Sequence, residues 1–312
     1  MSELRIGTSD LPPRTSFERY FGALRAIELS ALVGAPIKAP TLAKWKATLP
    51  PQSVALHAPW VITHRKAPCT TTRQTDAQSG DFRDSPLTRE ALSELATTAN
   101  ALNAWAVIFS APPLFSPSQT NRDRLRAFFA ELAPAEHYVG MQRVWIPDAL
   151  WEPVAAVRFA AELGVLCAVD PLIKDHEYRP GVFSELDTAY AYFRVLGLGR
   201  NNTLRQDALD ELAEAAAAYD SAAVMFATPE RWKDAKNFAR NLVELAGADE
   251  PAPPSTGYGT FGGSAAFAAP GGRAAMLAND FDGDADSDDA DDDDEADGSE
   301  FEDDDSADDN NA

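Results

Sequence analysis

The stretch Trp105-Ala-Val-Ile-Phe-Ser110 decides the fold, because it is short, apolar up to its last residue and followed by a helix-forming segment, Asn121–Leu132. Such runs, several of them rich in β-branched or aromatic residues, are typical of strands buried on both faces of a parallel sheet. Seven others recur, each followed by a stretch that predicts a helix: Leu4–Gly7, Arg25–Leu29, Val54–His57, Val139–Val144, Val165–Val169, Tyr192–Gly197 and Ala222–Ala227. Eight strand–helix repeats in about 250 residues predict an α/β fold, a closed (β/α)8 TIM-like barrel.

The segments between these strands predict an outer ring of helices. Asp84-Ser85-Pro86 provides a cap and a first-turn proline for one of them. Amphipathic periodicity marks Leu87–Leu102, Asn121–Leu132, Asp148–Leu163, Gln206–Tyr219 and Pro229–Leu245. In such a barrel a functional site is expected at the C-terminal ends of the strands, and the fold leaves the reaction open.

Charge divides the chain into three parts. It carries 49 acidic against 27 basic residues, and 19 of the acids lie between Asp280 and Asp309, so the rest of the chain is close to neutral. A stretch rich in Pro, Gly, Ala and Ser precedes them and offers little apolar surface to bury. We therefore predict a barrel over 1–248, a flexible linker over 249–279 and a disordered acidic tail over 280–312.

The acidic tail has three uses that the sequence leaves open. It can keep the protein soluble by self-repulsion, bind a basic protein partner, or fold back over the barrel mouth. Direct binding of nucleic acid by the tail is disfavoured, because phosphates would repel it.

Cysteine content and hydropathy indicate a cytoplasmic protein. Cys69 and Cys167 are the two cysteines, and they form no Cys-x-x-Cys pair. The first residues run into a predicted strand without a leader-like segment, and no apolar run reaches the roughly 18 residues of a membrane helix. We expect a soluble protein with no membrane partner.

An ordered set of short segments resembles a known family. The set comprises Arg5-Ile-Gly-Thr-Ser9, Phe17-Glu-Arg-Tyr-Phe21, Ile27-Glu28, Lys44-Trp45, Leu49-Pro50, Ala58-Pro59, Ile62-Thr63-His64, Ala111-Pro-Pro-Leu-Phe115, Asn121, Leu125, Phe128-Phe129, Arg143, Phe193-Arg194, Phe226, Ala235, Asn237 and Ala239. In order and spacing it is similar to the YecE-like proteins, the domain of unknown function numbered 72, over residues 4–246. The resemblance implies a TIM-type barrel, for which no activity is established.

The chain departs from that family's pattern at polar positions. Family residues that are usually Gly-Trp, a lysine, a carboxylate, a histidine and paired asparagines are here Asp10-Leu11, His57, Met141, Leu196 and Ala227-Thr228, and the second strand end retains only Glu28. These losses favour a degenerate barrel that works as a scaffold or binding module, with the acidic tail as an interaction or solubility element.

Two arginines in predicted strands suggest an anionic ligand. Arg143 and Arg194 could grip a carboxylate or phosphate at the barrel mouth. Each could instead pair with a carboxylate such as Glu28 or Asp170 inside the barrel, because an unpaired charge there is costly. The alternative function is therefore an enzyme or binder of a small phosphorylated or carboxylated metabolite at the C-terminal mouth.

Two further side chains are candidates for proton transfer. Glu28 ends the second predicted strand, and His64 follows the third within the Ile-Thr-His context of the resemblance. Thr8, Ser9 and His57 join Arg143, Asp170 and Arg194 as candidate ligand-binding residues. Each histidine could equally serve as a hydrogen-bonded structural residue.

We expect no cofactor and no metal ion. The chain has no Gly-x-Gly-x-x-Gly turn after a strand, no phosphate-binding Gly-x-x-x-x-Gly-Lys loop and no Gly-x-Ser-x-Gly elbow. Its histidines and acids show no ligand spacing. Whether the chain is an enzyme stays open.

Overall fold

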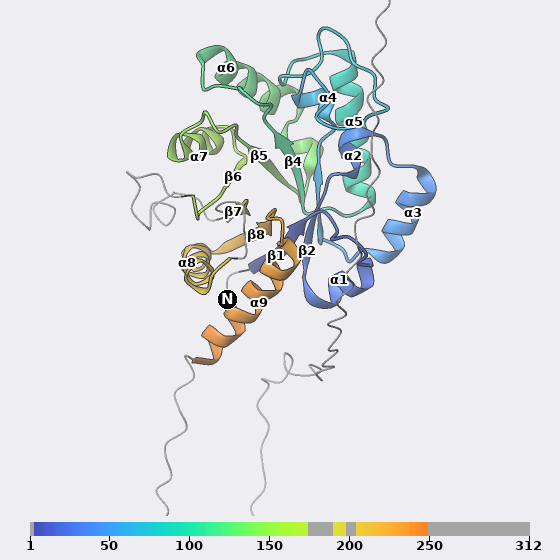
Figure 1. The fold of residues 1–312 in the computed structure, drawn as a ribbon. Helices are drawn as coiled ribbons and strands as arrows, with labels where there is room; N and C mark the ends of the chain where they lie inside the picture. The colour runs from blue at the N-terminus through green and yellow to red at the C-terminus, as the bar shows by residue number, and fades with distance from the viewer. Residues whose placement is uncertain (1–2, 174–189, 198–203, 249–312) are drawn as a thin grey trace, which may run out of the picture. The chain divides into compact units, whose positions relative to one another are not determined.

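The described residues form a closed barrel of eight parallel strands in the order β1 to β8 (Figure 1). The computed structural model describes residues 3–173, 190–197 and 204–248. The strands are β1 (Glu3–Ser9), β2 (Ala26–Leu29), β3 (Val54–His57), β4 (Ala106–Ser110), β5 (Gln142–Ile146), β6 (Leu166–Val169), β7 (Tyr190–Val195) and β8 (Ser221–Phe226). The predicted (β/α)8 barrel is confirmed.

Helices surround the barrel (Figure 1). They are α1 (Phe17–Ala23), α2 (Ala31–Gly34), α3 (Ala39–Thr48), α4 (Trp60–Thr63), α5 (Pro86–Ala101), α6 (Gln119–Ala127), α7 (Pro153–Glu162), α8 (Gln206–Ala217) and α9 (Arg231–Ala248), with a π-helical turn η1 (Phe128–Leu132) and a 3-10 turn η2 (Ala135–Tyr138). As predicted, Ser85 caps α5, and its Oγ accepts from the backbone N–H of Thr88.

The barrel lies within the compact unit Met1–Pro253. The predicted linker over 249–279 and acidic tail over 280–312 lie outside the described residues, as does most of the connection between β6 and β7. Those predictions stay predictions.

Alternating side chains divide the core into two layers. Val107 and Phe109 of β4 pack against the helices, whereas Ala106 and Ile108 of the same strand fill the barrel interior. Inside, the Trp105 ring stacks on Tyr192 with centroids 5.7 Å apart. The Arg5 guanidinium lies 5.1 Å from the centroid of that indole, near the N-terminal ends of the strands. The interior is thus packed there, and accessible polar groups are left to the C-terminal ends.

The fifth strand begins later than predicted. We expected Val139–Val144, but η2 ends at Tyr138, Val139 is 79% exposed, and Gly140 turns the chain with a positive φ of 77°. The strand therefore starts at Gln142. The seventh strand is also displaced, but in the opposite direction. It runs over Tyr190–Val195, two residues earlier than the predicted Tyr192–Gly197. These shifts decide where Arg143 and Arg194 lie.

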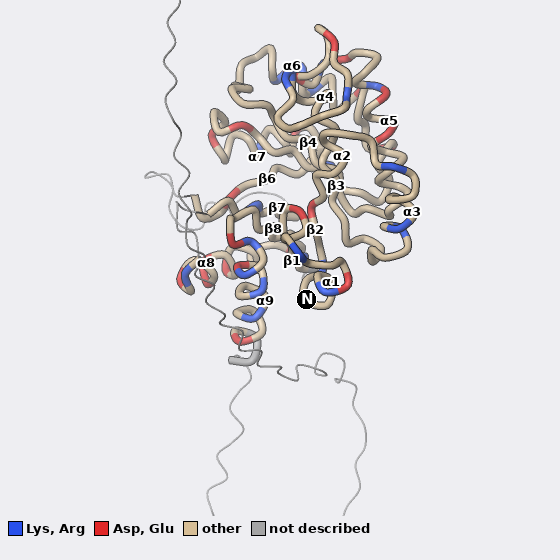
Figure 2. The backbone as a smooth tube through the Cα atoms, turned by 45° about the vertical axis from the view of Figure 1, so that its right-hand side comes forward, with Lys and Arg blue, Asp and Glu red and all other residues tan. Residues whose placement is uncertain are grey.

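The described helices carry a mixed charge. Lys and Arg lie along α3, α6 and α9, and acidic residues are interspersed with them on α6 and α9 (Figure 2). None of the described helices has the length and apolar composition needed to cross a membrane.

Candidate functional site at the barrel mouth

A buried carboxylate at the end of β2 forms the centre of the site. Glu28 is one residue from the end of β2 and lies in register with Ser9 of β1. It points into the barrel like Ala26 two residues earlier, and it is 0% exposed. Tyr192 and Arg194 project inward from β7 by the same two-residue period. Three separate strands thus bring polar groups to one point.

Every Glu28 oxygen is hydrogen-bonded. Oε1 accepts from the Tyr192 hydroxyl at 2.7 Å. Oε2 accepts from Nε of Arg194 at 3.1 Å and from Nε2 of His57 at 3.2 Å. Arg194 also donates from Nη2 to the Ser9 Oγ at 3.1 Å. Ser9, Glu28, His57 and Arg194 therefore form one connected group, which we call the mouth network, with Tyr192 beneath it.

The mouth network keeps Glu28 ionised. Burial alone would raise the pKa of the Glu28 carboxyl, but the Arg194 charge and the hydrogen bonds from His57 and Tyr192 outweigh it and hold that pKa below its usual range. Burial, and then the Glu28 charge, raise the pKa of Tyr192 well above its usual value, so the phenol stays a donor. Glu28 is consequently a fixed anion and a poor proton acceptor at neutral pH.

Asp170 lies beside this network and holds two loops. Its Oδ1 accepts from the backbone N–H of Leu172 at 3.0 Å, and its Oδ2 from that of Leu196 at 2.8 Å. Burial raises the pKa of Asp170, although these two hydrogen bonds and the Arg194 charge oppose the shift. Asp170 therefore joins the segment after β6 to the end of β7, next to Arg194.

Arg143 does not reach the mouth, so the predicted clamp of Arg143 with Arg194 does not form. It is the second residue of β5, at the N-terminal end of the strand, and shares the outward face with Trp145. Its guanidinium donates to backbone oxygens of Phe129, Ala133 and Gly164 at 3.1, 2.8 and 2.9 Å. The late start of β5 explains the difference, and Arg143 instead ties helix ends to the barrel wall.

Thr8 faces away from the interior. Its backbone N–H donates to the Tyr20 hydroxyl at 2.8 Å, and its own hydroxyl lies 3.0 Å from the same oxygen. Tyr20 in turn donates to the backbone oxygen of Ala26 at 2.7 Å. Thr8 therefore fastens α1 to β1 and β2, and the structure gives it no contact with the mouth network.

His64 also lies apart from Glu28. Its Nδ1 is 2.7 Å from the hydroxyl of Thr63, at the end of α4. Burial lowers the pKa of His64, and the charge of Asp81 opposes the shift. Glu28 is bound by other side chains, so the two residues predicted to move protons do not form a pair.

Tyr192 was missed by sequence reasoning. A signal was available, because it precedes Arg194 by two residues and therefore shares its face of the strand. A buried tyrosine hydroxyl usually needs a hydrogen-bond partner. The partner, Glu28, is 164 positions away in sequence, and single-sequence patterns do not connect such residues.

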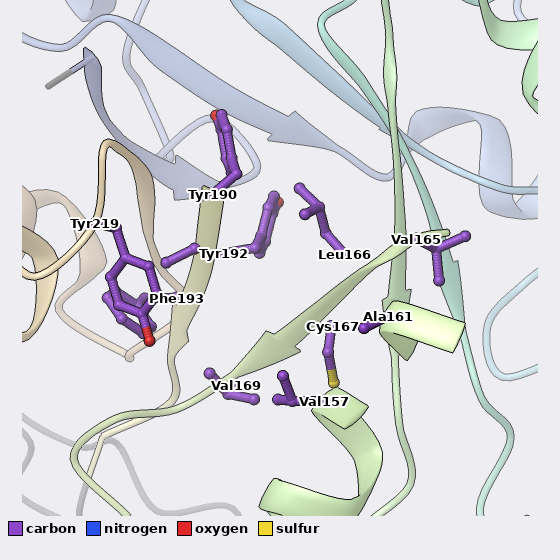
Figure 3. A pocket seen from close by; sticks show the side chains of 11 residues that line it. Val157, Ala161, Val165, Leu166, Cys167, Val169, Tyr190, Tyr192, Phe193 and Tyr219 are labelled. Atoms are coloured by element: carbon purple, nitrogen blue, oxygen red, sulfur yellow. The ribbon is translucent and has the colours of Figure 1, made fainter. Parts of the chain in front are cut away.

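Two hollows are lined by no residue of the mouth network, although Tyr192 beneath it lines the first. A cavity of about 80 Å³ is lined by apolar side chains of β6, β7 and α7, including Val157, Leu166 and Cys167 (Figure 3). Burial raises the pKa of the Cys167 thiol, so this cysteine is a packing residue and a poor nucleophile. A second hollow, of about 370 Å³, lies between α5 and the η1–η2 turns. Its Arg89 is already bound by Asp84.

Within the described ranges, no three His, Cys, Asp or Glu side chains gather in a way that could hold a metal ion. The histidine of the mouth network bonds one carboxylate, Glu28, and shares its Oε2 with Arg194. An arginine cation at that position fits a binding site for an anion better than one for a metal.

Two solved structures illustrate the likeness of this chain to known proteins. A DUF72 family protein from Thermotoga maritima aligns with a TM-score of 0.53 at 15% sequence identity, over 77% of this chain and 99% of that chain. A DUF72 family protein from Enterococcus faecalis aligns with a TM-score of 0.55 at 14% identity, over 79% and 98% of the two chains. At these identities the likeness shows the fold alone.

Sequence comparisons identify the family. Among curated proteins, none matches this chain significantly. The family model described as "Protein of unknown function DUF72" matches residues 6–257, which include every strand of the barrel from β2 to β8 and most of β1. The chain belongs to the DUF72 family.

Proposed function

We propose that this barrel is a binding module that holds a small carboxylated or phosphorylated molecule at its C-terminal mouth. The observation that carries the proposal is the state of Arg194. Its Nε and Nη2 are engaged by Glu28 and Ser9, while its Nη1 has no hydrogen-bond partner among the described residues. The Arg194 side chain is 21% exposed. A carboxylate or phosphate oxygen is the natural acceptor for such a nitrogen.

Glu28 has a positioning role in this proposal. Three donors fix its carboxylate, and it in turn fixes the orientation of Arg194 and His57. A guanidinium held in this way loses little conformational entropy when a ligand binds. The neighbouring charges of Glu28 and Asp170 oppose an anion, so a ligand needs further contacts besides the one with Arg194.

Two other functions compete with this one. Proton-transfer catalysis is disfavoured, because Glu28 is a poor proton acceptor and His64 is bound elsewhere. A scaffold whose acidic tract at 280–312 engages a basic protein partner is favoured by the internal neutralisation of Arg194 by Glu28. The scaffold differs from the binding module in a simple way, since it requires no small ligand at the mouth.

Ligand-induced stabilisation tests the proposal. The full chain is heated with increasing inorganic phosphate or acetate, and sodium chloride keeps the ionic strength constant. A ligand that binds only the folded state raises the thermal midpoint with the logarithm of its concentration above Kd. Arg194→Lys should lose this effect. Lysine retains the positive charge beside Glu28, but it has a single nitrogen and therefore lacks the equivalent of Nη1, which is left to bind a ligand.

Arg126→Lys is the matched control. Arg126 lies on α6 and is 46% exposed, and its partners are Asp123 and Glu162. The control should respond to anions like the wild type. If neither anion stabilises the wild type, or if Arg194→Lys responds as fully as the control, the binding module is wrong and the scaffold is favoured.

A further inference from the structure

Exposed apolar side chains gather on four consecutive loops at the mouth. Leu114 follows β4, Leu150 follows β5, Ile173 follows β6 and Leu196 follows β7. They are 80%, 51%, 51% and 46% exposed, and they are four of the seven large apolar residues exposed in the described ranges. We call these four side chains the apolar rim. Scattered apolar residues are ordinary on a surface, whereas a set on adjacent loops indicates a contact surface.

A single carboxylate holds the first two rim residues together. Asp148 accepts from the backbone N–H of Leu114 at 3.2 Å through Oδ2 and from that of Leu150 at 3.1 Å through Oδ1. Beneath them the Trp151 indole donates to the backbone oxygen of Phe115 at 2.7 Å, and both aromatic side chains are 4% exposed. Each of the two loops thus buries an aromatic residue and leaves the leucine before it in solvent.

Asp170 plays the equivalent part on the next two loops. It accepts from the backbone N–H of Leu196, and its backbone oxygen accepts from that of Ile173 at 3.3 Å. Leu196 is the first residue after β7 and lies two positions from Arg194 along the chain. The apolar rim therefore continues to the mouth network.

Leu114 adopts a backbone conformation that disfavours its side chain. Its φ is +67°, in the left-handed region where an L side chain is strained. Strain of this kind is retained mainly at sites where the conformation serves binding or catalysis. A leucine that is both strained and 80% exposed gains nothing from packing within the described chain, which points to a partner outside it.

We infer that the mouth takes an amphiphilic anion, a small molecule with a carboxylate or phosphate at one end and an aliphatic or aromatic body at the other. This inference rests on the proposed function and adds the class of ligand. The anionic end pairs with Arg194, and the apolar body lies across Ile146 and the apolar rim. Ile146 is the last residue of β5, and its partly buried side chain packs against the barrel interior. It offers an apolar contact, whereas the mouth network is polar. The apolar contact offsets the repulsion between the anionic end of the ligand and the carboxylates of Glu28 and Asp170.

A series of straight-chain carboxylates tests the inference. Acetate, butyrate, hexanoate and octanoate are titrated into the full chain below their micellar concentrations, and dissociation constants are measured by calorimetry. Each methylene that leaves water should tighten binding by up to about fourfold. We therefore expect octanoate to bind far more tightly than acetate. The affinity should rise with chain length until the alkyl chain covers the apolar rim.

Rim variants locate the apolar contact. Leu114→Ser combined with Leu150→Ser should flatten the dependence on chain length while leaving acetate binding unchanged. Leu114→Gly should weaken octanoate binding without lowering the thermal midpoint, because glycine accepts the positive φ. Val139→Ser is the matched control, since Val139 is 79% exposed but lies before β5, at the other end of the barrel. The control should bind the whole series like the wild type.

The outcomes separate the inference from the function on which it rests. If all four carboxylates bind equally through Arg194, the amphiphile is wrong and the anion-binding module stands. If octanoate binds the Arg194→Lys variant as tightly as the wild type, the site is apolar only, and the anionic end is wrong. If no carboxylate binds, the inference fails, and the proposed function fails with it when inorganic phosphate also gives no stabilisation.

Discussion

Glu28 is a buried charge whose partners all come from other strands. Tyr192 and Arg194 lie on β7 and His57 on β3, and the carboxylate has no exposed surface. Burying a charge is costly unless it is paired and hydrogen-bonded, and here each oxygen is bound. Removing any one partner would therefore leave a charge or a donor unpaired, and the free energy of unfolding should fall.

Replacing Glu28 by Gln should destabilise the fold. The variant leaves the Arg194 guanidinium without the carboxylate that it bonds, and the amide can present an N–H toward another donor. We expect a loss of about 3 kcal/mol in the free energy of unfolding, at the lower end for a broken buried pair because Arg194 is partly exposed. Urea unfolding at pH 7 measures the loss.

A double variant provides the control for that experiment. Glu28→Gln together with Arg194→Met removes both charges, so its loss should be smaller than that of Glu28→Gln alone. If the double variant is the less stable of the two, the unpaired guanidinium is not the cause of the destabilisation.

Acid should remove the contribution of Glu28. The folded-state pKa of this carboxyl lies below its value in the unfolded chain, about 4.3. At pH values between these two pKa values, the unfolded state therefore binds more protons than the folded state. The stabilisation by Glu28 is complete above the unfolded-state pKa and is lost as the pH falls toward the folded-state pKa. Unfolding free energies measured from pH 5 to pH 2 should fall more steeply for the wild type than for Glu28→Gln. Parallel curves would contradict the assignment.

At the scale of the element, strand identity could be predicted and strand boundaries could not. Apolar runs placed all eight strands, because burial on both faces leaves a strong compositional signal. The ends depended on turns that the pattern does not mark, as at Gly140 before β5. An error of a few residues moved Arg143 from the mouth to the other end of its strand. Ser9, Glu28, His57, Asp170 and Arg194 were predicted because they lie at or next to the C-terminal ends of their strands, and the shift of β7 leaves Arg194 next to that end.

Close approach of β1 and β2 requires glycine at position 7. A Cβ there would lie 2.0 Å from the backbone oxygen of Ala26 and 2.8 Å from Cε of Met225. Gly7→Ala should therefore lower the free energy of unfolding by at least about 3 kcal/mol, because the backbone of β2 must move. Thermal or urea unfolding measures the change.

Gly22→Ala is the matched control for Gly7→Ala. Gly22 lies in α1, and a Cβ there would meet nothing within 4 Å. The control should stabilise the protein by about 0.5–1 kcal/mol, because alanine favours a helix. Equal effects of the two substitutions would show that the contact between β1 and β2 is more yielding than the distances indicate.

At the scale of the whole molecule, the fold was predictable because it rests on repetition. Eight similar units reinforce one another, so an error in any one boundary leaves the barrel intact. The site depends on contacts such as that of Tyr192 with Glu28, which connect residues far apart in sequence. The apolar rim is invisible in the sequence for the same reason, since Leu114 and Leu150 lie far apart in the chain and are joined through the Asp148 carboxylate.

Removing residues 249–312 tests whether the barrel stands alone. All eight strands and α9 end by Ala248, so the truncated chain retains the whole described fold. We expect its thermal midpoint to stay within a few degrees of the full chain's value. The removed segment contains most of the excess acid in a chain of net charge −22, so solubility should fall as self-repulsion is lost. Calorimetry and turbidity measure the two effects.

A large drop in the thermal midpoint would show that folding depends on residues after 248. Unchanged solubility would contradict the solubility role of the acidic tract and favour a role in binding.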